Sequence, residues 1–162
     1  MNRKIFIHGG EILNSERYQS MKDFRQHGSV SVHEHSLRVA DRSLKIKEFL
    51  EKLHVRMNER AVVRGALLHD YFLYDWHDKK RRRKLHGFNH PEEALKNAER
   101  DFDLSDRERD IISKHMFPLT ITKIPMCREA WVVNAADKWC SAEETVSMRK
   151  TPHGKSKLKP ET

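Results

Sequence analysis

Residues 30–53 constrain the fold more than any other part of the sequence, because their apolar side chains recur at the spacing of an α-helix. The apolar positions form two overlapping stripes: Leu37, Ala40 and Leu44 in one, and Val39, Ile46, Leu50 and Leu53 in the other. Two overlapping stripes give a wide apolar surface, which is typical of a helix that neighbouring elements cover on more than one side. The segment therefore predicts a central, mostly buried helix.

Four further segments carry helix signals. Asn58 can cap a helix over residues 59 to about 72. Pro91 followed by two glutamates is typical of a first helical turn, with the proline at the first helical position. Ser105 begins a capping box, SDRE, and a last long helix is expected from about 127 to 148. Since no convincing strand pattern is present, the chain is expected to be an all-α bundle of about six helices.

The length and composition fit one globular domain. We expect residues 1–148 to form the helical domain and residues 149–162 a basic, disordered tail. With 37% hydrophobic and 35% charged residues, the chain has the composition of a well-solvated globular protein. No apolar run is long enough to cross a bilayer, and the N-terminus has no apolar core of a signal peptide. We therefore expect no membrane partner and a cytoplasmic location by default.

Positive charge is concentrated in two segments of the chain. Residues 79–84 (KKRRRK) carry six positive charges, and residues 149–162 carry a net charge of +4. Because the whole chain has a net charge of +8, the remainder is at −2. This distribution argues against a broad nucleic-acid-binding face. It leaves open a nucleic-acid-associated protein that uses the basic run and the tail to bind phosphates.

An ordered series of histidines and aspartates is the main functional signal. Its members are distributed over the expected helices and their ends: His35, His69, Asp70, His90, His115 and Asp137. A carboxylate on an apolar helix face, as at Asp70 and Asp137, is costly unless it is paired or binds a metal. A metal site inside a helical bundle takes one or two inward side chains from each helix. Periodicity alone does not separate His33 from His35, because each faces one of the apolar stripes.

Several of these segments resemble a known family. The segments HSLRVA at 35–40, LLHD at 67–70 and AAD at 135–137 resemble the HD superfamily of metal-dependent phosphohydrolases, which is all-α and has the basic pattern H…HD…D. His90, followed by proline, and His115 resemble the longer arrangement of bimetallic members, which include HD-GYP phosphodiesterases, although the GYP triplet is absent. The resemblance covers about residues 30–145 and selects His35 over His33. It implies an HD-domain helical bundle.

The resemblance also implies roles for the six residues. His35, His69, Asp70 and Asp137 would hold a first metal ion, with His69 and Asp70 as the catalytic HD pair. Asp70 would bridge to a second ion held by His90 and His115. Imidazole and carboxylate ligands without thiolate suit iron, manganese, zinc, cobalt or nickel. Met116 stands where HD-GYP proteins have a further histidine, so the second of the one or two divalent ions is expected to bind more loosely.

Candidate substrate contacts have two interpretations each. Arg38 either contacts a phosphate or forms a surface ion pair. His86 either donates a proton to the leaving group or is a solvated loop residue. The basic run, which includes Lys79, Lys80, Arg81 and Arg82, either attracts an anionic substrate or is simply solvated.

These inferences lead to a functional hypothesis. The chain is expected to be a phosphomonoesterase or phosphodiesterase that cleaves a phosphate ester of a nucleotide or similar phosphorylated metabolite through a metal-activated water. One alternative is the nucleic-acid-associated protein described above, whose binding would fall steeply with salt. The other is a regulatory domain that binds a nucleotide without cleaving it, against which the complete ligand set argues.

Overall fold

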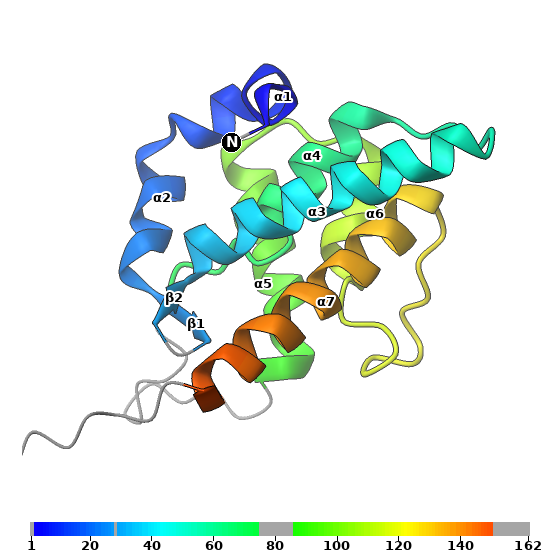
Figure 1. Ribbon diagram of the computed structural model, residues 1–162. Helices are drawn as coiled ribbons and strands as arrows, with labels where there is room; N and C mark the ends of the chain where they lie inside the picture. Colours follow the sequence, from blue (N-terminus) through cyan, green and yellow to red (C-terminus); the bar gives the residue numbers. More distant parts are fainter. Residues whose placement is uncertain (1, 28, 75–85, 151–162) are drawn as a thin grey trace, which may run out of the picture.

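The fold is known from a computed structural model that describes residues 2–27, 29–74 and 86–150 (Figure 1). The described elements, in chain order, are α1 (Arg3–Leu13), α2 (Glu16–Gln19), a 3₁₀ helix η1 (Ser20–Asp23), β1 (Arg25–His27), β2 (Val30–Ser31), α3 (Val32–Lys52), α4 (Glu59–Leu68), α5 (His86–Asp101), α6 (Asp106–Lys114) and α7 (Arg128–Lys150). Seven α-helices in the described ranges, against about six expected, confirm the all-α class. None of the helices described is long and apolar enough to cross a membrane.

Helix α3 begins at a capping box and packs against α4 and α7, which lie alongside it in Figure 1. Ser31 accepts a hydrogen bond from the Glu34 amide, and Glu34 accepts one from the Ser31 amide, so both orphan donors are satisfied. The expected apolar stripes are buried at Val39 and Leu44. The prediction was wrong at Leu53, which is exposed because the helix ends one residue before it.

Helix α4 is more completely enclosed than α3. It begins where the sequence predicts, with the Asn58 side chain accepting from the Ala61 amide, and every residue from 61 to 68 is buried. Gly65 allows α6 to approach closely, because a Cβ there would lie 2.5 Å from Ile111 Cδ1. The helix ends at Leu68, four residues before the predicted end, so the residues that follow it form a turn.

The boundaries of the later helices differ in part from the sequence prediction. Helix α5 begins at His86, so Pro91 lies inside the helix rather than at its first position, and one main-chain hydrogen bond is lost there. Helix α6 has the predicted capping box at Ser105. Helix α7 extends to Lys150, past the expected domain boundary at 148. Residues 151–162 and the basic run at 79–84 lie outside the described residues, and the tail remains a prediction.

A short antiparallel hairpin, which the sequence did not indicate, connects the N-terminal helices to α3. Strands β1 and β2 contain three and two residues, which is too short for an apolar alternation to be visible. The hairpin contacts both α3 and α7. It places Gln26 beside the buried ends of the helices.

Candidate metal centre

Six side chains from separate parts of the chain converge among the helices. They are the residues that the sequence singles out as metal ligands: His35, His69, Asp70, His90, His115 and Asp137. None of the six is more than 7% exposed. The structure therefore brings every predicted ligand into one buried cluster.

Three of these residues, His35, His69 and Asp137, form what we name the first triad. His35 lies in the first turn of α3, His69 directly follows α4, and Asp137 lies on α7. Asp137 Oδ1 lies 3.0 Å from His35 Nε2 and 3.7 Å from His69 Nε2. Each residue offers one ligand atom, and these atoms all lie within 4.8 Å of one another. Three helices thus supply donors that can surround a single cation.

The other three residues, Asp70, His90 and His115, form the second triad. His90 lies on α5, and His115 directly follows α6. The two Nε2 atoms are 2.8 Å apart, and Asp70 Oδ1 lies 3.2 Å from His90 Nε2 and 3.3 Å from His115 Nε2. This compact triangle of two imidazoles and a carboxylate is a second possible cation site.

Asp70 lies between the two triads and directs one oxygen to each. Its Oδ1 belongs to the second triad, whereas its Oδ2 lies 3.5 Å from His69 Nε2 and 3.9 Å from His35 Nε2. A carboxylate in this position can contribute a ligand to two neighbouring cations. The arrangement is the one that the predicted bridging role of Asp70 requires.

His69 and His115 occupy equivalent positions at the C-terminal ends of α4 and α6. His69 Nδ1 lies 2.7 Å from the carbonyl oxygen of Ala66, and His115 Nδ1 lies 2.8 Å from that of Ile112. The last carbonyls of a helix have no partner within the helix, so they can accept these bonds. When Nδ1–H donates to a carbonyl, Nε2 keeps its lone pair for a metal. The negative ends of both helix dipoles also favour a cation here.

His35 is held from behind by a side chain instead of a carbonyl. Its Nδ1 lies 3.0 Å from Glu144 Oε2, and the Glu144 carboxylate is buried. The sequence analysis did not single out Glu144. Its position offered a signal, because it follows Asp137 by seven residues and therefore lies on the same face of α7.

Two more polar side chains that sequence reasoning missed reach the centre. Gln26 Nε2 donates to Asp70 Oδ2 at 2.6 Å. Lys138 Nζ donates to the carbonyl oxygen of His115 at 2.9 Å and lies 4.0 Å from Asp137 Oδ2. Lys138 is adjacent in sequence to a predicted ligand, but nothing around Gln26 indicates a contact with a residue 44 positions away.

The first triad is an ion-paired cluster. Burial alone would lower the pKa of His35, but its hydrogen bonds to Asp137 and Glu144 raise that pKa to about 10. Burial likewise disfavours protonated His69, yet the neighbouring Asp70 and Asp137 carboxylates raise the pKa of this histidine. Burial would raise the pKa of Asp137, but His35 and His69 hold it below its ordinary value. The carboxylates therefore favour positive charge in this half of the site.

The second triad has the opposite balance. Burial lowers the pKa of His115, and the neighbouring His90 and His69 lower it further, while Asp70 acts only partly against them. Burial would raise the pKa of Asp70, but His69, His115 and His90 hold it well below its usual range. The second triad thus presents neutral imidazole at His115 and ionised carboxylate at Asp70 near neutral pH.

Two buried polar atoms at the centre test whether a metal ion fits these residues. Among the described residues, His69 Nε2 and Asp70 Oδ1 form no hydrogen bond of good geometry, although the ion-pair contacts given above surround both atoms. A buried polar atom that lacks a well-aligned hydrogen bond costs free energy, and both atoms carry lone pairs that a cation can accept. Together with the thiolate-free donor set, they fit one or two divalent metal ions.

The remaining predicted site residues are not part of the cluster. Arg38 has a side chain that is 54% exposed, and its Nη1 lies 3.4 Å from Glu144 Oε1. His86 is the first residue of α5, and its side chain lies outside the described residues, as do Lys79, Lys80, Arg81 and Arg82. Their roles in substrate binding remain predictions. His33, the alternative to His35, packs against the Tyr18 ring with the ring centroids 5.3 Å apart.

Comparison with family models gives one match. The model of the HD domain matches residues 32–141, which is more than half of the chain. The chain belongs to the HD domain family. Members of this superfamily are generally metal-dependent hydrolases, and HD domain proteins bind divalent metals. Searches of curated proteins and of solved structures found no match.

Proposed function

We propose that this HD domain protein is a phosphohydrolase that uses one or two divalent metal ions to cleave a phosphate ester of a nucleotide or similar phosphorylated metabolite. The observation that carries the proposal is the position of Asp70, whose two oxygens face different triads of buried donors. Paired cation sites that share a carboxylate are suited to holding both the attacking and the leaving oxygen of a phosphoryl group.

Each part of the centre has a distinct task in this proposal. A bound divalent metal would supply the acidity that generates hydroxide near neutral pH and would offset charge that develops on the phosphoryl oxygens. The carbonyls behind His69 and His115 orient the two rings. Gln26 fixes the rotation of the Asp70 carboxylate through its 2.6 Å hydrogen bond. These residues keep the donors in place, so little reorganisation is needed when substrate binds.

A groove beside the centre supports the choice of substrate class. It has a volume of about 920 Å³, which is within the range of small-molecule pockets, and its lining includes Arg38, Lys138, Trp139 and Val146 together with the carboxylates Glu143 and Glu144. Lys138, which lies near the centre, suits a phosphate, whereas Arg38 is paired with Glu144. The exposed side chains of Trp139 and Val146 suit a planar base. Lys138 connects the groove to the centre through its proximity to Asp137. A nucleotide combines the groups that this lining favours.

A hydrolysis screen tests the proposal. Protein treated with chelator and reloaded with Mn²⁺ should release phosphate or a nucleoside monophosphate from members of a panel of nucleotides, simple phosphomonoesters and phosphodiesters. Asp137→Asn should abolish this activity, because it removes a donor of the first triad. Asp41→Asn is the matched control, since Asp41 pairs with Lys45 on the surface of α3 and should leave the activity intact.

The same screen separates the alternatives. Protein that is inert on the whole panel when loaded with metal would contradict the proposed function. Nucleotide binding without cleavage would favour the regulatory alternative instead. Trp139→Ala should raise KM for nucleotides more than for phosphomonoesters without a base, and an equal effect on both would argue against the groove as the base site.

A further inference from the structure

Glu144 is a buried carboxylate that lies behind the metal centre. Its side chain is 1% exposed and emerges from α7 two helical turns after Asp137. Oε2 lies 3.0 Å from His35 Nδ1, and Oε1 lies 3.4 Å from Arg38 Nη1. Both oxygens are therefore engaged, and the residue lies three positions beyond the segment that matches the HD domain model.

The contact determines which way the His35 ring faces. When Nδ1–H donates to a carboxylate, the ring presents Nε2 to a metal ion, which would displace the proton of Nε2, the atom that lies 3.0 Å from Asp137 Oδ1 in the metal-free protein. The other two histidines with a known partner behind them, His69 and His115, use main-chain carbonyls at helix ends. His35 lies in the first turn of α3, where the free main-chain groups are N–H donors. This end of the helix therefore offers no free carbonyl that could accept a hydrogen bond from Nδ1.

We propose that Glu144 is a positioning residue that orients His35 for a metal ion in the first triad and thereby sets the affinity of that triad. The proposal rests on the metal site assigned above, and in it Glu144 acts on the metal through His35 rather than as a ligand. Carboxylates that accept a hydrogen bond from a metal-binding histidine fix the ring and make it a stronger donor, and their removal typically weakens metal binding about 10-fold to 100-fold.

A purely structural role for Glu144 makes a different prediction. Glu144 could simply link α7 to α3 through His35 and Arg38, in which case its replacement would lower the stability of the metal-free protein without a selective effect on one metal ion. The two triads allow the distinction, because Glu144 contacts His35 of the first triad, and the hydrogen bonds of its carboxylate go to His35 and Arg38. Metal affinity measured for each triad is thus the decisive readout.

Co²⁺ titration of the full chain provides that readout through its visible absorption and through competition with a chelator. In Glu144→Gln, the affinity for one ion per chain should fall about 10-fold or more, and the affinity for the other should not change. Glu144→Asp should recover part of the loss, since it keeps the charge but has a shorter reach. Repeating the comparison in a His115→Ala background leaves the first triad as the complete donor group among the described residues.

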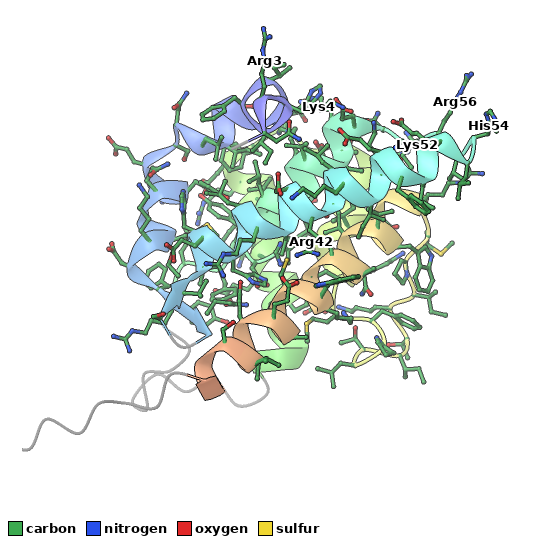
Figure 2. The ribbon with its side chains drawn as sticks, viewed as in Figure 1. Arg3, Lys4, Arg42, Lys52, His54 and Arg56 are labelled. Carbon is green, nitrogen blue, oxygen red and sulfur yellow. The ribbon has the colours of Figure 1, made fainter. Side chains whose placement is uncertain are left out.

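Glu143→Gln is the matched control. Glu143 is the preceding residue on α7, and its side chain is 55% exposed. It pairs with Arg42 of α3, whose label in Figure 2 stands between α3 and α7. This variant should bind both ions as the wild type does. Circular dichroism and thermal unfolding of the metal-free variants monitor the fold independently.

The outcomes are distinct. Unchanged affinity in Glu144→Gln, or an equal loss in Glu143→Gln, would overturn the positioning role, as would a wild-type chain that binds no Co²⁺. If the wild type binds Co²⁺ but hydrolyses nothing, the proposed function fails, while the effect of Glu144→Gln on affinity still decides the role of Glu144.

Discussion

The two triads of the candidate centre are built from similar residues but are supported differently. The first triad joins α3, α4 and α7, which pack directly on one another, and Glu144 fixes His35 from behind. The second joins the turn after α4 to α5 and α6, and its position depends on how α6 packs against α4. Among the residues that the structure describes, only Asp70 belongs to the geometry of both.

The charge balance of the triads differs as well. Asp137 and Glu144 surround His35 with two carboxylates, and the pKa of His35 is raised to about 10. In the second triad two imidazoles share one carboxylate oxygen, and burial lowers the pKa of His115. More negative charge binds a cation more tightly, so we expect the first triad to hold its ion more strongly. The comparison suggests how one centre can combine a permanent ion with an exchangeable one.

Removing the shared residue should have the largest effect. Asp70→Ala takes away a carboxylate that faces both triads, so it should strip both metal ions and abolish hydrolysis. Elemental analysis of the purified variant beside the wild type measures the first effect, and the substrate panel measures the second. If Asp70→Ala retains one ion at wild-type affinity, the shared geometry is not functional, and the triads are independent sites.

Removing a residue of the second triad alone should separate the two ions. His115→Ala should leave about one ion per chain, held by the first triad and Asp70 Oδ2. Activity should still collapse, because the clamp on the attacking and leaving oxygens needs both ions. In the wild type, mild chelation should remove this second ion first. Full metal content and full rate in His115→Ala would mean that His115 is a packing residue and that the centre is mononuclear.

How much of this centre was predictable depends on the kind of contact. The identities of the six ligands follow from their apolar surroundings and their resemblance to the family, because side chains on inward helix faces repeat with the helical period. The helix ends at Leu68 and Lys114 were not predicted, since no glycine or proline marks them, and these ends give His69 and His115 their carbonyl partners. The contact between Gln26 and Asp70 depends on a hairpin whose strands are too short to give a recognisable sequence pattern.

The packing of α6 against α4 offers a subtler test of the second triad. A Cβ at Gly65 would lie 2.8 Å from Ile111 Cγ2 and 3.0 Å from Ile111 Cβ, so α6 would have to shift. Overpacking of this kind costs about 1–3 kcal/mol. Because His115 follows Ile111 by four residues, Gly65→Ala should lower the free energy of unfolding and weaken the second ion several-fold, with little effect on the first.

Gly10→Ala on α1 is the control for that substitution. A Cβ at Gly10 meets no atom within 4 Å, so alanine there should stabilise the helix by about 1 kcal/mol. Urea unfolding of the metal-free proteins measures the free energies, and Co²⁺ titration measures the two affinities. If Gly65→Ala weakens both ions equally, the position of α6 is not specific to the second triad.

The pH dependence of the metal-free protein should show the smallest difference between the triads. The pKa of His35 is about 10 in the folded protein, against an ordinary value of 6.5 for the unfolded chain. The stability that protonated His35 contributes is therefore complete below pH 6.5 and is lost as the pH rises through 10. The pKa of His115 is lowered in the folded protein, so protonation of this histidine favours the unfolded chain. The stability that neutral His115 contributes is therefore lost as the pH falls below 6.5. The two histidines should therefore give opposite slopes.

Urea unfolding between pH 5 and pH 10 can resolve these slopes when each histidine is replaced in turn. His35→Gln should flatten the decline in stability between pH 6.5 and 10, whereas His115→Gln should flatten the loss below pH 6.5. His54→Asn is the control, since His54 lies just beyond the exposed end of α3 in Figure 2 and its backbone φ of 62° is one that asparagine also adopts.

A bound metal replaces the proton of His35, so the stabilisation by metal should grow as the pH rises toward 10. Parallel pH profiles for the two histidine variants would contradict the opposite charge balance of the two triads.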